Sequence, residues 1–242
     1  VADPAITSGL PVFHWWVQST GAAETVAGTR CSLFHNGVLY DNIFCRIRGG
    51  TSISWSKKSY KLEFNDGYEF QRQPGHTVDE FDLNTTYTDK SYNRAVLHYE
   101  LNRDAGLPSP DTFQVQLRRN GTFYSVTLYT EQPDADFLRR TGLDPDGALY
   151  KGGPGANGDS IAGYEKKTRE EESFFDLQSL ITGVAQTGSS LERFVFDQID
   201  VPAEVNFMAC MAVTQNIDGT DKNHFLYRDT GGSREWRTLP WD

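Results

Sequence analysis

The segment 215–242 constrains the fold of this chain more than any other stretch. An apolar run with helical spacing, over 203–214, leads into it, and a loop rich in polar side chains follows. That loop holds Asp218 and Asn223, five positions apart, and two strand-like segments come after it within 224–239. The sequence therefore predicts a helix, a polar loop and a hairpin in direct succession.

The spacing of Asp218 and Asn223 matches an arrangement used in phosphoryl transfer. There an Asp accepts the proton of the attacking hydroxyl, and an Asn five positions later helps to hold a metal ion. The hairpin leads to Pro240-Trp241-Asp242, so that Asp242 adds a carboxylate that could serve as a second metal ligand. Asp and Asn are also common in plain turns, because their side chains bond to nearby backbone groups. The spacing alone fits either a catalytic loop or a polar turn.

Further motifs precede this segment, and their order is more specific than any one of them. They are Arg48-Gly49-Gly50-Thr51-Ser52, Lys57-Lys58-Ser59-Tyr60-Lys61-Leu62, Tyr129-Thr130-Glu131-Gln132-Pro133-Asp134, Leu149-Tyr150-Lys151-Gly152 and Tyr164-Glu165-Lys166-Lys167-Thr168. Together with the C-terminal segment, they give about residues 40–242 a sequence that resembles the spore-coat protein H (CotH) family of atypical protein kinases.

The resemblance implies an α+β chain with a protein-kinase-like, two-lobed fold that forms one domain over residues 1–242. The N-lobe, over about residues 12–131, would be an antiparallel sheet. The C-lobe, over residues 132–242, would be mainly helical. It would also be truncated, because CotH-like domains continue past the position of Asp242.

Runs of aromatic and β-branched residues predict strands in the first half of the chain. The predicted strands and hairpins cover 12–17, 31–40, 43–48, 58–64, 112–118 and 122–130. Asn120 and Gly121 favour a tight turn between the last two. After residue 64 we expect a loop rich in Asp and Thr, which ends where a helix opens at Asp89.

Helical spacing and end signals predict the helices of the chain. The predicted helices cover 89–104, 135–141, 168–185, 190–198 and 203–214. In the last helix, the expected buried stripe consists of Val205, Met208, Ala209, Ala212 and Val213. The density of Gly and Pro over 142–163 predicts a mobile flap.

Alternation along 58–64 places Lys58 on the same face as the apolar Tyr60 and Leu62, whereas Lys61 lies on the opposite face. The resemblance implies that Lys58, with Lys61 as the second choice, orients the phosphates of ATP. Either residue also fits a plain strand-end lysine whose ammonium group reaches water.

The order of elements that the resemblance implies gives further nucleotide contacts. A kinase-like lysine strand is followed by a helix that supplies a glutamate partner, here Glu100. Glu100 and Arg103 also fit an exposed i,i+3 ion pair. The connector after the strand 122–130 contains Glu131 and Gln132, where the adenine base would bind.

The function that the resemblance implies is ATP-dependent and requires Mg²⁺ or Mn²⁺. Asp218 would act as the base and Asn223 and Asp242 would hold the metal ion, while the γ-phosphoryl group passes to Ser or Thr of another protein. The alternative within the family is a non-catalytic surface adhesion or interaction module. A carbohydrate-active hydrolase is a third hypothesis, which would need two acids that face each other across a cleft.

Charge and hydropathy argue against two classes of partner. The chain has 33 acidic residues against 23 Lys and Arg, a net charge of −10, which argues against a nucleic-acid partner. No apolar run approaches the ~20 residues of a membrane-spanning helix. Val1 begins directly in polar sequence, so any targeting peptide is expected to have been removed or never to have been present. No pattern in the sequence specifies an oligomeric state.

The three cysteines bear on the cellular compartment. Cys31 and Cys45 flank a predicted hairpin and fit either a disulfide between neighbouring strands or two buried thiols. A disulfide would indicate an oxidising compartment, and we expect a secreted or cell-surface protein. Cys210 lies within an apolar helix and is expected to be a small core residue.

Overall fold

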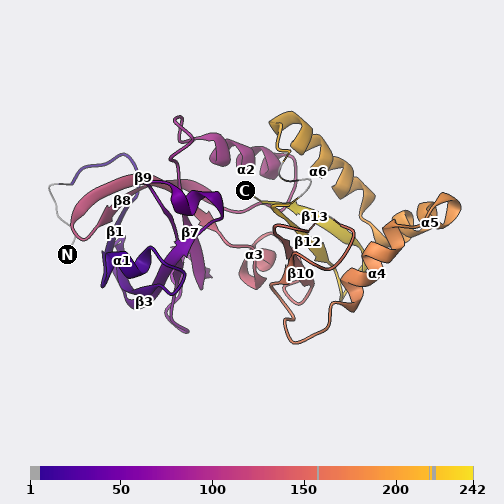
Figure 1. The fold of residues 1–242 in the computed structure, drawn as a ribbon, viewed down its shortest axis with the longest axis horizontal. Coiled ribbons are helices and arrows are strands. Elements are labelled where there is room, and N and C mark those ends of the chain that lie inside the picture. Colours follow the sequence, from indigo (N-terminus) through magenta and orange to yellow (C-terminus); the bar gives the residue numbers. More distant parts are fainter. Residues whose placement is uncertain (1–5, 157, 218, 220–221, 242) are drawn as a thin grey trace. The chain divides into compact units, whose positions relative to one another are not determined.

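The structure, a computed structural model, describes residues 6–156, 158–217, 219 and 222–241. The chain forms two compact units (Figure 1). The first unit comprises the chain up to Leu97 together with Asp111–Gln132, and the second comprises His98–Pro110 together with the chain from Pro133 onward. The prediction that the whole chain is a single domain stays a prediction.

A closed barrel forms the first unit. Around it the strands follow the order β1 (Val12–Val17), β2 (Thr29–His35), β3 (Val38–Arg48), β4 (Ser59–Glu63), β7 (Glu80–Thr85), β9 (Thr122–Glu131) and β8 (Thr112–Arg119). Neighbours pair antiparallel, except that β1 and β8 run parallel, with Val12 opposite Gln116. This last pairing closes the barrel and gives each of these strands a hydrogen-bonded neighbour on both sides.

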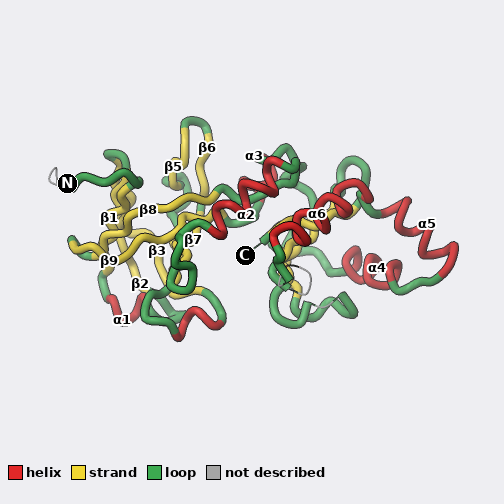
Figure 2. The backbone as a smooth tube through the Cα atoms, turned by 90° about the horizontal axis from the view of Figure 1, so that it is seen from above, coloured by secondary structure: helices red, strands yellow, loops and turns green. Residues whose placement is uncertain are grey.

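Shorter elements complete the first unit. They are α1 (Thr20–Ala23), the 3₁₀ helix η1 (Thr51–Ser54), the hairpin of β5 (Phe70–Gln73) and β6 (His76–Val78), and the start of α2 (Arg94–Asp104). Figure 2 shows the β5–β6 hairpin extending from the barrel strands. Phe70 of this hairpin is nevertheless buried, and its ring centroid lies 4.9 Å from that of Phe81. The hairpin therefore contributes to the barrel core.

Aromatic side chains fill the barrel. Trp15, Tyr60, Phe81 and Tyr129 are fully buried and come from four different strands. The ring centroids of Trp15 and Tyr60 lie 4.6 Å apart, and those of Phe81 and Tyr129 lie 4.9 Å apart. Tilted ring pairs at these separations pack favourably, so the aromatic residues supply much of the area that stabilises the barrel.

The prediction of an α+β, protein-kinase-like fold, with an antiparallel N-lobe sheet and a mainly helical C-lobe, is wrong. The sheet of the first unit is closed and mixed, because β1 pairs in parallel with β8, and the second unit contains a four-stranded sheet of its own. Alternating apolar residues identify strands, but the same pattern does not determine which distant strands become neighbours. The alternation of apolar residues therefore could not predict that the sheet closes into a barrel.

Strand β7 occupies a segment that the composition predicts to be a loop. It lies between β4 and β9 in the barrel. Phe81 and Leu83 are fully buried, and Asp82 and Asn84 occupy the alternate positions. Only two apolar residues alternate in this segment, and Asp and Thr surround them. The polar composition therefore predicts a loop more strongly than the short alternation predicts a strand.

The second unit is built around a four-stranded antiparallel sheet. Its strands follow the order β11 (Tyr164–Lys166), β10 (Ala148–Gly152), β12 (His224–Arg228) and β13 (Trp236–Pro240). The helices of this unit include α3 (Ala135–Arg140), α4 (Phe175–Val184), α5 (Gly188–Gln198) and α6 (Val201–Thr214). Side chains of α3 pack on one face of the sheet and those of α4 on the other. Strand β10 lies within the segment predicted to be a mobile flap.

Helix α6 buries a face other than the predicted one. Its buried side chains are Phe207, Cys210 and Met211, which pack with Leu107. Most of the predicted stripe is exposed, including Val205, Met208 and Val213. Because α6 is apolar around most of its circumference, helical spacing fits two different faces. The burial of Cys210 agrees with the prediction for that residue.

Several local predictions are confirmed. Strand β1, helices α3, α5 and α6, and the hairpin of β8 and β9 lie where the patterns place them to within a few residues. Asn120 and Gly121 have φ angles of +50° and +85°, as their tight turn requires. All three cysteines are buried free thiols, which is one of the two alternatives for Cys31 and Cys45. In the part of the chain that the structure describes, no helix is long and apolar enough to cross a membrane.

Barrel closure can be tested at Phe13 of β1. Its side chain is fully buried, so Phe13→Ala is expected to lower the free energy of unfolding by about 3–5 kcal/mol. The matched control is Phe123→Ala, because that side chain is 56% exposed and its loss should change stability by less than about 1 kcal/mol. Urea denaturation measures both. Equal effects of the two substitutions would contradict the inward orientation of β1.

Candidate functional site

Polar side chains gather on the outer face of the barrel in the first unit. Tyr60 and Leu62 of β4, Phe81 and Leu83 of β7 and Tyr129 of β9 belong to the barrel core, and this set comes from alternate positions of these strands and from β3. We call it the barrel polar cluster: Arg48, Lys61, Asp82, Asn84, Thr130 and the adjoining Gln132. Charged side chains with little access to water need partners, because leaving water carries a large penalty in free energy.

Asp82 is at the centre of the barrel polar cluster and has no exposed surface. Its Oδ2 lies 2.7 Å from Nη1 of Arg48 and accepts a hydrogen bond from Nε2 of Gln132. The same Arg48 nitrogen donates to Oδ1 of Asn84, and Nδ2 of Asn84 donates to Oγ1 of Thr130 over 3.1 Å. The carboxylate therefore links β3, β7 and the end of β9, and it fixes the guanidinium of Arg48.

Lys61 lies on β4 directly opposite Asp82, and its side chain is 14% exposed. Its Nζ forms an ion pair with Glu80 and lies 3.9 Å from Oε1 of Glu63. Lys61 and Arg48 are therefore two cations on one face, each held in a defined position by carboxylates of neighbouring strands. Such an arrangement suits the binding of phosphate oxygens, since the cations are aligned before a ligand arrives.

Lys58 has a different environment from Lys61. It lies just before the first residue of β4, and its Nζ donates a hydrogen bond to the carbonyl oxygen of Ile53 in η1, over 2.6 Å. Glu100 is exposed on α2. The ion pairs of Lys61 are with Glu80 and Glu63.

Glu131 ends β9 and Gln132 follows it, and both side chains are engaged within the first unit. Oε1 of Glu131 lies 3.3 Å from Nε2 of His76, and Oε2 accepts the backbone N–H of Asp111 over 2.9 Å. Gln132 is 4% exposed and donates to Asp82. The side chains of these two predicted residues therefore support the barrel, and the backbone N–H of Glu131 also donates to the carbonyl oxygen of Asp111 over 3.0 Å.

In the second unit, the predicted metal ligand Asn223 lies at one end of the sheet. His224 pairs with Pro240, so the start of β12 and the end of β13 lie side by side. Asn223 precedes this pair, has φ of +56°, and donates its backbone N–H to the carbonyl of Gly152 on β10 over 3.0 Å. Gly152 itself lies so close to His224 that an added Cβ would lie 2.9 Å from Nε2 of the ring.

Lys151 lies at the same end of the sheet, and its motif fits either a contact with substrate or phosphates or a solvated charge. Its Nζ lies 5.2 Å from the centroid of Trp241, a residue that is 3% exposed and directly precedes Asp242. Asp218 and Asp242, the predicted base and metal ligand, lie outside the described residues. Within the described ranges, no group of three or more His, Cys, Asp or Glu side chains is arranged to hold a metal ion.

Glu204 connects the two segments that lead to Asp218 and Asp242. It lies on α6, which precedes the polar loop, and its Oε1 accepts the backbone N–H of Thr238 on β13. Burial raises the pKa of Glu204 above its ordinary value of 4.5, partly offset by the hydrogen bond from Thr238. The carboxylate thus joins α6 to β13.

Two functional candidates, Arg48 and Asp82, were not selected from the sequence. Arg48 opens the motif Arg48-Gly49-Gly50-Thr51-Ser52, which does not indicate that its side chain meets a buried carboxylate. Asp82 lies in the segment predicted to be a loop. The alternation of polar and apolar residues in β7 could have identified Asp82, because a charged side chain in a buried strand needs a partner.

Comparison with known proteins identifies relatives of the chain. The sequence model of the family described as CotH kinase protein matches residues 45–242. The "Inner spore coat protein H" of Bacillus subtilis (strain 168) is 28% identical over 208 residues, which cover 81% of this chain and 56% of that protein. The chain therefore spans little more than half the length of this curated relative.

The barrel polar cluster predicts a large effect of removing Asp82. Asp82→Ala would leave Arg48 partly buried without its carboxylate, and it should lower the free energy of unfolding by about 3–5 kcal/mol. The matched control is Glu63→Ala, which breaks the more exposed pairs of Glu63 with Arg46 and Lys61 and should change stability by about 1 kcal/mol or less. Urea denaturation measures both, and a small effect at Asp82 would contradict the central role of this residue.

The raised pKa of Glu204 predicts a pH dependence of stability. A folded-state pKa above the unfolded value gives a contribution that is present below pH 4.5 and is lost as the pH rises through the folded pKa. The free energy of unfolding of the native protein should therefore fall relative to Glu204→Gln as the pH rises from about 4 toward neutrality. Thermal denaturation across this range tests it, with Glu192→Gln on α5 as the matched control. A difference that does not change with pH would refute the assignment.

Proposed function

Because the chain belongs to the CotH kinase protein family, we propose that it is an ATP- and divalent-metal-dependent protein kinase. It would transfer the γ-phosphoryl group to a Ser or Thr hydroxyl of another protein. The single observation that carries this proposal is the register of β12 and β13, in which His224 pairs with Pro240. This register brings Asn223, a predicted metal ligand, and Trp241, the residue before Asp242, to one end of the sheet.

The donor set fits a hard divalent cation. Asn223 offers an amide oxygen and Asp242 a carboxylate, and oxygen ligands of this kind are the ones that Mg²⁺ and Mn²⁺ prefer. The backbone of Asn223 is fixed by its hydrogen bond to Gly152, which limits the freedom of the side chain. A bound metal ion would neutralise charge on the phosphate oxygens. Asp218 would orient the acceptor hydroxyl and take its proton.

For the phosphate-orienting role, we favour Lys61 over Lys58. Lys61 is aligned by Glu80 and belongs with Arg48 to the barrel polar cluster, whereas Nζ of Lys58 is bonded to the backbone of η1. The proposed partnership of this lysine with Glu100 remains a hypothesis for mutagenesis. Backbone groups of the connector at Glu131 and Gln132 are the proposed contact with the adenine base.

The substrate is proposed to be a protein of a secreted or surface layer. The relative from Bacillus subtilis is named as an inner spore coat protein, and the acidic chain studied here would meet proteins rather than nucleic acids in such a layer. A non-catalytic interaction module is the competing function, and it is consistent with the same relative. The two functions differ in whether the chain binds ATP.

Isothermal titration of ATP in the presence and absence of Mn²⁺ or Mg²⁺ separates these functions. We expect metal-dependent binding that weakens at least about tenfold in Asp242→Ala, because a charged ligand to the metal is lost. Asp218→Ala should keep ATP binding but slow phosphoryl transfer to a Ser/Thr peptide library about 10²–10⁴-fold. Asp197→Ala, on the exposed surface of α5, is the matched control. Absence of ATP binding by the folded protein would favour the interaction module.

A further inference from the structure

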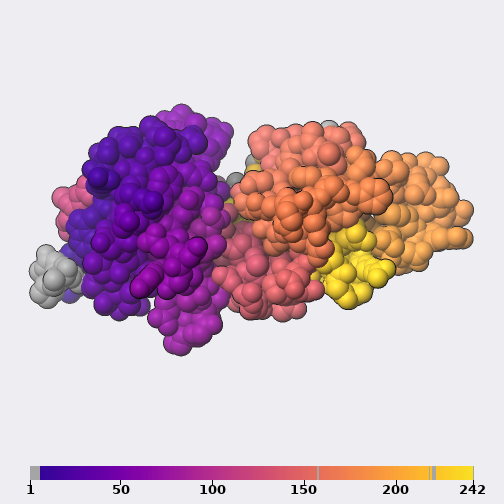
Figure 3. Space-filling view, turned by 90° about the horizontal axis from the view of Figure 1, so that it is seen from below, coloured from indigo at the N-terminus to yellow at the C-terminus, as the bar shows by residue number. Residues whose placement is uncertain are grey.

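A pocket of about 590 Å³ opens on the second unit, on the face of the sheet that packs against α4. It lies between the loop that leads into α4 and the turn between β12 and β13. Figure 3 shows the yellow β12–β13 segment at the surface beside orange segments of the same unit. Lys151 and Trp241 lie on the other face of the sheet, because they occupy alternate positions to Tyr150 and Trp236. The pocket is therefore separate from the candidate active site.

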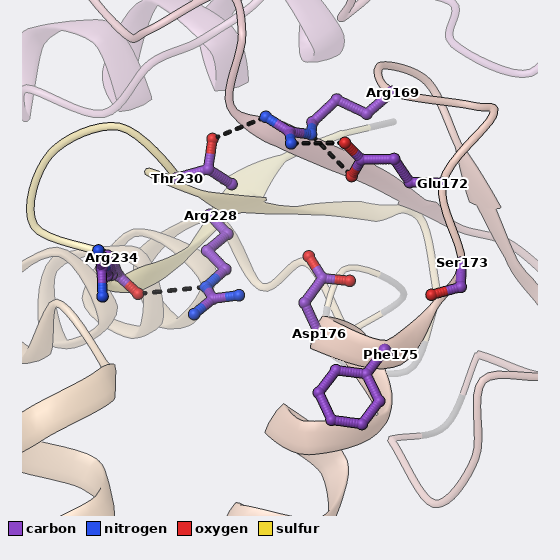
Figure 4. A pocket seen from close by; sticks show the side chains of 8 residues that line it. All are labelled: Arg169, Glu172, Ser173, Phe175, Asp176, Arg228, Thr230 and Arg234. Atoms are coloured by element: carbon purple, nitrogen blue, oxygen red, sulfur yellow. Dashed lines mark hydrogen bonds and ion pairs between the residues drawn. The ribbon is translucent and has the colours of Figure 1, made fainter.

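Arg228 is the main cationic group in the pocket (Figure 4). It ends β12, its guanidinium carbon lies 5.8 Å from the centroid of Trp236, and its Nε donates to the carbonyl oxygen of Arg234 over 3.4 Å. Among the described residues, Arg228 and Arg234 form no ion pair with a carboxylate within 4.0 Å. The two guanidinium groups therefore remain available to an anion.

The carboxylates of the pocket already have partners. Glu172 forms a double hydrogen bond with Arg169, and Arg169 also donates to Oγ1 of Thr230 over 3.2 Å. Asp176 accepts the hydroxyl of Tyr150 and the backbone N–H of Leu177. Neither acid forms an ion pair with Arg228 or Arg234, and the lining carries three arginines against two acids, so the pocket keeps positive charge in a protein whose net charge is −10.

The walls of the pocket are fixed before any ligand binds. Lys166 is 3% exposed at its side chain and donates to the carbonyl oxygen of Ser173 over 3.1 Å, which holds the loop before α4. In the opposite wall, Asp229 accepts the backbone N–H groups of Gly232 and Ser233 over 2.9 and 2.8 Å. These bonds fix the turn that carries Arg234, and preorganised donors lose little entropy when they bind.

The shape of the pocket favours a peptide over a free ion. Phe175 lines it with a side chain that is 78% exposed, and such a ring can pack against an apolar neighbour of the bound group. Asp176 directs its carboxylate into the pocket (Figure 4), where it can accept a backbone N–H. Guanidinium pairs bind phosphate through two parallel hydrogen bonds, which is a recurring mode of phosphopeptide recognition.

We propose that this pocket binds a phosphorylated Ser or Thr of an extended peptide. The phosphate lies between Arg228 and Arg234, a backbone N–H bonds to Asp176, and the next apolar side chain packs on Phe175. The binding does not require the chain to be an enzyme. It would dock phosphorylated protein segments on a face that is separate from the candidate active site.

Fluorescence anisotropy with a labelled peptide of sequence Gly-Ala-phosphoserine-Leu-Ala, in the absence of ATP and metal, tests the proposal. The unphosphorylated peptide should bind at least about tenfold more weakly, as expected for the loss of a charge-assisted pair. Arg228→Gln and Arg234→Gln should each weaken the phosphopeptide at least about tenfold. Arg193→Gln on the exposed surface of α5 should leave the affinity unchanged.

Several outcomes would overturn the proposal. They are equal affinity for the two peptides, unchanged affinity in both arginine variants, and binding of inorganic phosphate, AMP or phosphatidate vesicles that exceeds binding of the phosphopeptide. Thermal denaturation shows whether Arg228→Gln is folded, since its guanidinium packs on Trp236. If that variant does not fold, Arg234→Gln decides the question, because the Arg234 side chain is exposed. The failure of ATP binding would not affect this result.

Discussion

An ionised carboxylate without access to water is stable only if neighbouring groups replace its hydration, and Asp82 sets this requirement for the first unit. Arg48 and Gln132 meet it from two other strands, while Asn84 and Thr130 complete the hydrogen bonds around Arg48. This part of the outer face of the barrel therefore carries polar side chains that are shielded from water and bonded to one another. A sheet face normally carries either buried apolar side chains or polar side chains in contact with water. That face is also where the cations proposed to contact phosphate are aligned.

The sequence predicted local features well because their causes are local. Helix, polar loop and hairpin near the C-terminus, the turn at Asn120 and the family follow from spacing and ordered motifs. Barrel closure, the strand around Asp82 and the buried face of α6 depend on partners far away in the sequence, which no window of residues contains. In the candidate site, the prediction for Lys58 assumed that this residue belongs to the strand. The strand begins one residue later, at Ser59, so strand alternation does not determine the direction of the Lys58 side chain.

A sheet with two unlike faces organises the second unit. One face carries Leu149, Phe225 and Trp241 with Lys151 at its end, and the other carries Tyr150 and Trp236 with Arg228 at its end. Period-two alternation separates the two sets of side chains even though they share the same strands. One short sheet can thus support two chemically distinct surfaces, and each is fixed by its own apolar cluster. Changes on one face need not disturb the other.

The parallel pairing of β1 with β8 has a consequence for the nascent chain. Val12 lies opposite Gln116, about a hundred residues later in the chain, so β1 is synthesised long before β8. One edge of β1 therefore stays unpaired until the strands and the helix between them have been made. Pairings of this long range are slow to form and expose edges meanwhile. The family match begins at residue 45, inside β3, yet β1 and β2 close the barrel. A chain trimmed to that match would carry two open strand edges, at β3 and β8.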